Sequence, residues 1–148
     1  MSSAKKKVIV SACILGEYCR YDGKIKEFNV VKEAFKEYEI IPFCPEAPLF
    51  GTPRERISVV KVDGKNRIIT DETLIDVTPR LEEEINTFCK KNPLAEAIVL
   101  KSKSPSCGYK TTPILDKNGN VAEIGNGIAA QIFTKFYPNI AILDENSF

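Results

Sequence analysis

Four cysteines in turn-forming segments are the strongest candidates in this chain for binding a metal or taking part in catalysis. They are Cys13, Cys19, Cys44 and Cys107, each with glycine or proline within a few residues. Such tight loops can approach a bulky ligand, and thiolates from distant segments can share an iron–sulfur cluster. The chain contains no histidine, so neither a thiol–imidazole pair nor an imidazole metal ligand is available. The pattern favours a metal or cluster site built from thiolates.

Other uses of these thiols stay open at this point. No Cys-x-x-Cys pair is present, which disfavours a zinc knuckle and a thioredoxin-like redox motif. The four loop cysteines could still form a closed structural zinc site, or remain isolated loop thiols. A further alternative is a sulfur-transfer enzyme in which Cys107 is a persulfide nucleophile. The fifth cysteine, Cys89, falls on the inward face of an amphipathic segment and is predicted to be a core residue.

Polar residues beside two of these cysteines are candidates for acid–base chemistry. Glu46 follows Cys44 by two residues at the end of an apolar segment. A desolvated carboxylate there is a better proton acceptor near neutral pH, while a solvated loop glutamate is the alternative. Ser102, Ser104 and Ser106 precede the last cysteine. At least one of these serines is expected to cap a turn.

Short apolar segments alternate with amphipathic ones and indicate the elements that position these residues. Strands are predicted over Val8–Ala12, Ile40–Phe43, Ser58–Val62, Arg67–Thr70, Ala97–Leu100, Ile114–Asp116, Val121–Glu123 and Ile140–Leu143. Helices are predicted from Asn29 through Tyr38, from a Thr78-Pro79 cap to about Asn92, and from Asn126 onward with Ile128, Ile132, Phe133 and Phe136 facing inward. Two hairpins are predicted around Asp63-Gly64 and Asn118-Gly119.

This alternation predicts an α/β fold. We expect a single domain of residues 1–148 with a mainly parallel sheet flanked by helices (Rossmann-like), plus one or two β-hairpin insertions. Ligands of such sheets bind beyond the carboxyl ends of the strands. Cys13, Cys44 and the segment 102–108 each follow a predicted strand. Three strand ends are therefore expected to bring a thiol to one edge of the sheet.

Composition narrows the function further. The chain has 148 residues, 43% hydrophobic and 28% charged, which is typical of globular proteins. Its net charge of +1 excludes a broad nucleic-acid-binding surface. The apolar segment after the basic N-terminus is too short for a signal peptide or a membrane span. We therefore expect a cytoplasmic location, where thiols stay reduced.

The motifs, taken in order, resemble those of the thiouracil desulfurase (TudS) family. They are Val-Ser-Ala-Cys-Ile-Leu-Gly-x-x-Cys-Arg-Tyr-Asp-Gly, Cys-Pro-Glu with Pro-Arg downstream, Lys-Ser-Pro-Ser-Cys-Gly, and Gly-Asn-Gly. The resemblance extends from Val8 to the last predicted helix. It implies a [4Fe-4S] cluster held by three cysteines, with one iron open. It also implies removal of sulfur from a thiolated pyrimidine without net redox change, giving uracil and hydrosulfide.

The resemblance implies three cluster ligands, whereas four cysteines lie in the motifs. The predicted topology favours Cys13, Cys44 and Cys107, one from each strand end, and leaves Cys19 as the fourth candidate. The open iron would bind the thiocarbonyl sulfur of the substrate as a Lewis acid.

The resemblance also implies a catalytic glutamate and a catalytic serine. Glu46 corresponds to the catalytic glutamate and is expected to activate water. Ser104 is preferred as the catalytic serine, with Ser102 and Ser106 as alternatives. Contacts with a small thiolated pyrimidine, either a free base or a nucleoside, are expected from Ser106, Gly125 and Asn126. The last two belong to Gly125-Asn126-Gly127, which opens the last predicted helix, whose free N–H groups could bind an anion or a carbonyl oxygen; a simple cap is the alternative.

Overall fold

The structure is a computed structural model that describes residues 6–12, 33–45, 56–144 and 147. Cys13, Cys19 and Glu46 lie outside these residues. The described elements are β1 (Lys7–Ser11), β2 (Glu39–Phe43), β3 (Ile57–Val62), β4 (Lys65–Thr70), α3 (Thr78–Lys91), β5 (Ala97–Val99), β6 (Thr112–Leu115), β7 (Val121–Gly125), α4 (Ile128–Phe136) and β8 (Ile142–Leu143). The fold is α/β with a mainly parallel sheet, as predicted. None of the helices formed by the described residues has the length and apolarity needed to span a bilayer.

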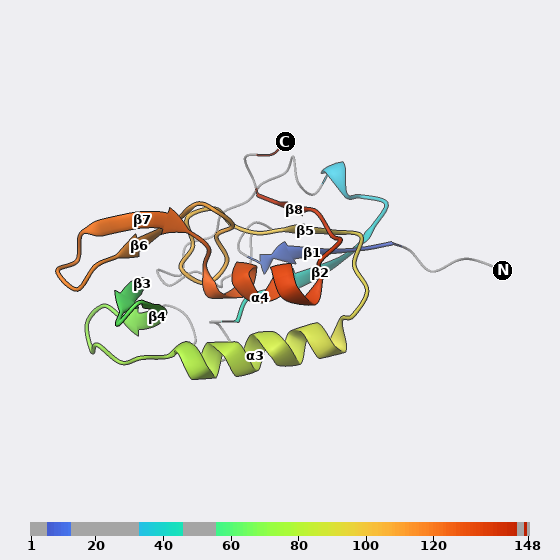
Figure 1. The fold of residues 1–148 in the computed structure, drawn as a ribbon. Coiled ribbons are helices and arrows are strands. Elements are labelled where there is room, and N and C mark those ends of the chain that lie inside the picture. Colours follow the sequence, from blue (N-terminus) through green and yellow to red (C-terminus); the bar gives the residue numbers. More distant parts are fainter. Residues whose placement is uncertain (1–5, 13–32, 46–55, 145–146, 148) are drawn as a thin grey trace.

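The first sheet is parallel and contains the predicted N-terminal strand at an inner position. Its strand order is β2-β1-β5-β8, and Val8 lies between Ile40 and Ala97 in register. Val8, Ile9 and Val10 are completely buried, as expected for a strand of a parallel sheet that is covered on both faces. The parallel pairing places the carboxyl ends of β1, β2 and β5 at one edge, which confirms that part of the prediction (Figure 1).

The two predicted hairpins form a second sheet of order β4-β3-β6-β7. Asp63 and Gly64, with φ values of 51° and 79°, make the turn between β3 and β4, the positive-φ geometry that suits a tight hairpin. The hairpins join through parallel pairing of β3 with β6, where Val59 lies opposite Ile114. This long-range pairing was not expected from the local patterns.

Helices α3 and α4 pack against each other beside the first sheet (Figure 1). Phe133 of α4 is fully buried, and its ring centroid lies 5.0 Å from that of Phe43 at the end of β2. Cys89 is buried in the same core, as predicted. The prediction that Phe136 faces inward is wrong, since that residue is 39% exposed. The helix ends at Phe136, and the next residue, Tyr137, occupies the core instead.

The predicted helix starts also need correction. Thr78 is the first helical residue of α3 and not its cap, because Val77 occupies the cap position. The Thr78 hydroxyl instead accepts the N–H of Ile68 at 2.7 Å, which connects α3 to β4. Helix α4 likewise begins after Gly127 and not after Asn126.

The predicted helix over 29–38 is described only from Glu33. Glu33 and Ala34 are helical, and a turn follows in which the Tyr38 N–H donates to the Phe35 carbonyl at 2.9 Å. The helix therefore ends before Tyr38, and this turn leads directly into β2.

Candidate functional site

The carboxyl edge of the first sheet brings the described parts of the candidate site together. Cys44 directly follows β2 and is half-buried, whereas Cys107 lies in the loop after β5. These strands flank β1, whose last residue, Ser11, accepts the N–H of Lys101 with its hydroxyl oxygen at 2.9 Å. Cys13 follows β1 by two residues, just beyond the described segment. Cys44 and Cys107 thus follow the strands on either side of β1, the strand that precedes Cys13 in the chain.

Ser104 organises the loop that carries Cys107. Its Oγ accepts the backbone N–H of Cys107 at 3.0 Å and that of Ser106 at 3.2 Å. Its carbonyl accepts the N–H of Gly108 at 2.8 Å. These bonds close a compact turn, and they confirm that a serine of this segment has a capping role.

The thiol of Cys107 lies inside this turn. Cys107 is 5% exposed and Ser106 is 1% exposed. The Ser106 hydroxyl donates to the Cys107 sulfur at 3.7 Å, and the hydroxyls of Ser104 and Ser106 are 3.1 Å apart. A hydrogen bond to sulfur stabilises the thiolate form, which is the form that binds metal. The loop is suited to present Cys107 as a ligand.

Carbonyl groups of the same loop satisfy the first N–H groups of α4. The N–H groups of Gly127 and Ala129 donate to the carbonyls of Gly108 and Ser106, both at 2.7 Å. The Ile128 N–H donates to the Pro105 carbonyl at 3.3 Å. A helix N-terminus normally needs such partners for its exposed donors. Helix α4 therefore supports the loop and does not offer these three N–H groups to a ligand.

Two glycines permit this close packing. A Cβ atom at Gly127 would lie 2.8 Å from the carbonyl oxygens of Ser104 and Pro105, and one at Gly108 would lie 1.9 Å from the Thr112 Oγ1 atom. Both distances are shorter than normal contacts with a Cβ atom. Both glycines lie inside the sequence motifs, Ser-Pro-Ser-Cys-Gly and Gly-Asn-Gly, but local patterns alone do not reveal these close contacts.

Thr112 supports the site, although no sequence pattern points to it. Its Oγ1 donates to the Ser104 carbonyl at 2.7 Å, and the residue is 1% exposed. A threonine at the start of a strand is common. The local sequence therefore carries no signal for this contact, which depends on how β6 meets the loop.

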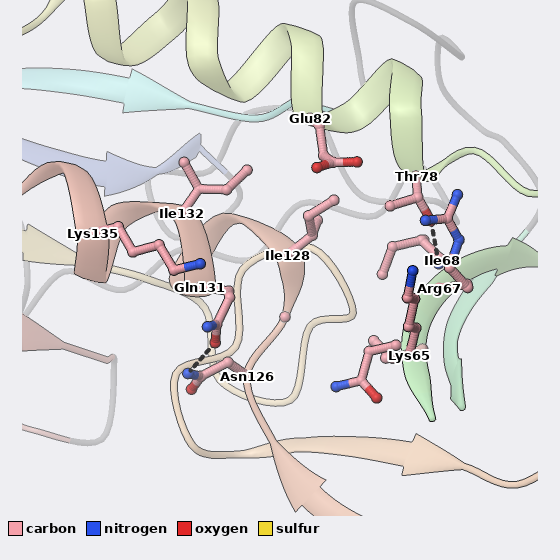
Figure 2. A pocket seen from close by; sticks show the side chains of 13 residues that line it. Lys65, Arg67, Ile68, Thr78, Glu82, Asn126, Ile128, Gln131, Ile132 and Lys135 are labelled. Atoms are coloured by element: carbon pink, nitrogen blue, oxygen red, sulfur yellow. Dashed lines mark hydrogen bonds between the residues drawn. The ribbon is translucent and has the colours of Figure 1, made fainter. Parts of the chain in front are cut away.

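Asn126 and Gly125 lie next to this loop. The Asn126 Oδ1 accepts the N–H of Lys110 at 2.7 Å, and its Nδ2 donates to the Gln131 Oε1 at 3.1 Å (Figure 2). Gly125 packs on Ile114, whose Cδ1 would lie 2.8 Å from an added Cβ. Contacts of Asn126 and Gly125 with a substrate stay predictions.

A pocket of about 290 Å³ lies on the other side of Gly127, between β4, α3 and α4 (Figure 2). Its wall combines apolar side chains with lysine, arginine, glutamate and amide groups. The lining residues are Val59, Lys65, Asn66, Arg67, Ile68, Thr78, Glu82, Asn126, Gly127, Ile128, Gln131, Ile132 and Lys135.

The donor chemistry of the described site fits an iron–sulfur cluster. Cys44 and Cys107, on loops that follow β2 and β5, would offer soft thiolate ligands, which suit iron or zinc better than magnesium or calcium. Within the described ranges, no three His, Cys, Asp or Glu side chains come together as a metal site. Three of the predicted functional residues, Cys13, Cys19 and Glu46, lie outside those ranges.

The protein is thus of the α/β class, and its candidate site consists of thiols on loops at the carboxyl edge of the parallel sheet. The profile of the 2-thiouracil desulfurase family matches residues 8–145, and the chain belongs to this family. The match covers every motif on which the sequence resemblance depends.

Two individual proteins are similar to this chain. TudS, a [4Fe-4S]-dependent thiouracil desulfidase of known structure, superposes with a TM-score of 0.68 at 30% identity, over 97% of this chain and 93% of that one. YbbK, an uncharacterised protein of Bacillus subtilis (strain 168), is 29% identical over 109 residues, or 68% of this chain and 72% of that protein.

Proposed function

We propose that this chain is a cytoplasmic enzyme that removes sulfur from a thiolated pyrimidine by hydrolysis. Thiouracil and water would give uracil and hydrosulfide, with no net oxidation or reduction. The observation that carries the proposal is the Ser104-centred turn, which places a buried Cys107 at the carboxyl edge of the sheet. Family membership and the similarity to TudS support the same reaction.

We assign the cofactor to three cysteines at this edge. Cys13, Cys44 and Cys107 would hold a [4Fe-4S] cluster, with Cys19 as the alternative ligand. Such a cluster, when bound, supplies a thiophilic Lewis acid for the thiocarbonyl sulfur. Support comes from the positions of Cys44 and Cys107 on loops that flank the end of β1.

The proton transfers fall to residues of the chain itself. In this proposal, Glu46 takes a proton from the water that attacks the thiocarbonyl carbon. Ser104 orients that water. Its oxygen already accepts two backbone N–H groups, so its hydroxyl acts as a donor; in this structure that donor is directed at the Ser106 oxygen 3.1 Å away, and it would turn to the water when substrate is bound. Ser102 and Ser106 are the alternatives, but the Ser106 hydroxyl already donates to the Cys107 sulfur.

The two other functions receive less support. A closed zinc site would use all four loop cysteines and leave no position for a substrate. A persulfide mechanism needs an accessible nucleophile, whereas Cys107 is 5% exposed. The open cluster with a carboxylate base is therefore the proposal favoured by both the family and the loop geometry.

The test is the substitution Glu46→Gln in anaerobically reconstituted protein. We expect iron and labile sulfide to match the unsubstituted protein while uracil formation from 2-thiouracil is lost. The matched control is Glu37→Gln, at an exposed position just before β2, which should keep full activity. Full activity of the Glu46→Gln protein would overturn the assignment of the base.

A further inference from the structure

We propose that the pocket between β4, α3 and α4 binds a small organic anion that has an apolar body. This site goes beyond the proposed desulfidase function. Its ligand class is a single ring, or a group of similar size, that carries one carboxylate or phosphate. The proposal follows from three features of the pocket: the positive side chains that line it, its apolar lining, and its position beside the helix start that supports the Cys107 loop (Figure 2).

The charges that line the pocket are mainly positive. Lys65 of β4 and Lys135 of α4 lie on opposite walls (Figure 2), and neither has an ion-pair or hydrogen-bond partner among the described residues. Glu82 is the one acidic residue among those that line the pocket. An anion in the pocket would be attracted by both lysines and would accept a charge-assisted hydrogen bond from the one that it reaches.

Arg67 contributes less positive charge, because it is already neutralised. Its Nε contacts the Asp76 Oδ2 at 2.7 Å. Burial opposes ionisation of Asp76, but hydrogen bonds from Arg67 and Thr78 outweigh that effect and hold the pKa of Asp76 below its usual value. The two lysines are therefore the cations left for a ligand.

The floor of the pocket is apolar and preformed. Ile68 is 2% exposed, and Val59 beside it is buried in the same core. Ile128 and Ile132 of α4 complete the floor and pack against that core. Ligand sites in proteins typically combine such an apolar surface with a few placed polar groups. The volume of about 290 Å³ limits the ligand to a small molecule.

The pocket is separate from the candidate thiol site. Ser104, Ser106 and Cys107 do not line it, although Asn126, an expected substrate contact, does. Gly127 lies between the two, because it lines the pocket while its backbone packs against Ser104 and Pro105. A ligand in the pocket would thus contact the helix start that supports the Cys107 loop without touching the thiol.

Calorimetric titration of the cluster-loaded protein tests this proposal. The probes are phenyl phosphate and benzoate, which distinguish a phosphate from a carboxylate ligand, and neutral benzyl alcohol as the control. We expect saturable binding of at least one anion that weakens as salt is added, and no binding of benzyl alcohol. Binding of neither anion, or equal binding of benzyl alcohol, would overturn the proposal.

Variants locate the site. Lys65→Gln and Lys135→Gln should each weaken binding of the anion about fivefold, as expected for the loss of one exposed charge contact. Lys90→Gln, in the last turn of α3 and outside the pocket, should bind like the unsubstituted protein. Unchanged affinity in both pocket variants would contradict the assignment.

A competition experiment tests the separation of the two sites. Uracil, the expected reaction product, should not displace the anion. Displacement would show that the pocket is part of the substrate site and would overturn the proposal of a separate one. This experiment measures binding alone, so its result is independent of whether the protein desulfurates thiouracil.

Discussion

The side chain of Thr112 donates a 2.7 Å hydrogen bond to the carbonyl oxygen of Ser104. This bond joins the first residue of β6 in the second sheet to the loop that follows β5 in the first. Ser104 in turn fixes the backbone N–H of Cys107. The second sheet therefore helps to hold the predicted cluster ligand in place.

Thr112→Val should remove this bond while nearly preserving the volume of the side chain. We expect the free energy of unfolding to fall by about 1 kcal/mol, because a partly buried acceptor loses one of its two donors. Iron retention during anaerobic dilution should fall with it. Urea unfolding measures the first effect and iron analysis the second. Thr112→Ser should restore both, and failure of the serine variant to do so would assign the effect to packing.

Gly127→Ala should disturb the contact between α4 and the Cys107 loop. The added methyl would meet the carbonyl oxygens of Ser104 and Pro105 at 2.8 Å, and overpacking of this kind costs about 1–3 kcal/mol. We expect reduced iron content after reconstitution, measured against protein concentration.

Gly119→Ala is the matched control for this change. Gly119 has a φ of 84° in the β6–β7 turn, and an added Cβ would meet no atom within 4 Å. Its substitution should cost backbone strain of about 1–2 kcal/mol but leave the iron content unchanged. Equal iron loss in both variants would show that general destabilisation, and not the loop contact, is responsible.

Cysteine substitutions separate ligands from the other thiols. Alanine at Cys13, Cys44 or Cys107 should abolish or greatly reduce the iron and labile sulfide of reconstituted protein, because each removes one predicted ligand. Alanine at Cys19 should leave both quantities near normal. If the Cys19 variant loses the cluster and the Cys13 variant keeps it, Cys19 and not Cys13 is the third ligand.

Cys89 should behave as a core thiol, and its titration gives a pH prediction. Burial raises the pKa of Cys89 from 9.0 to about 11. The unfolded chain then loses this proton before the folded protein does, so stability is complete below pH 9 and declines as the pH rises toward 11. The contribution lost by pH 10 is about 1 kcal/mol.

Urea unfolding of Cys89→Ala between pH 8 and pH 10 checks this expectation. The variant should be less stable at pH 8, because a cavity replaces the sulfur, but its stability should fall less steeply with pH. Burial and the neighbouring Cys89 also raise the pKa of Tyr137. The stability of the variant should therefore still fall as the pH rises above 10, but less steeply than that of the unsubstituted protein. An identical pH dependence of the two proteins would contradict the assignment.

Local patterns were sufficient to predict most strands and the edge at which they end. Val8–Val10 form a continuous apolar segment, and Asp63-Gly64 is a strong turn signal; both predictions are confirmed. The patterns could not show that β3 pairs with β6, because this contact joins residues that are far apart in the chain. The contact between Thr112 and the loop was missed for the same reason.

The errors in the helices have physical causes that are also non-local. Thr78 resembles a cap, but its hydroxyl bonds to the backbone of β4. Asn126 resembles a cap as well, but carbonyl groups of a distant loop satisfy the N–H groups of α4. At the start of α4, tertiary hydrogen bonds replace the local ones that the sequence suggests; at the start of α3, the local bond comes from Asp76, whose Oδ1 accepts the Thr78 N–H at 2.9 Å.

The most direct test of the central claim is a product analysis of the anaerobically reconstituted protein. Incubated with 2-thiouracil in the absence of any oxidant or reductant, the cluster-loaded protein should release uracil and hydrosulfide in equal amounts over many turnovers. Protein without iron should release neither. Cluster-loaded protein that forms no uracil under these conditions, or a reaction that proceeds only with an added redox partner, would contradict the account.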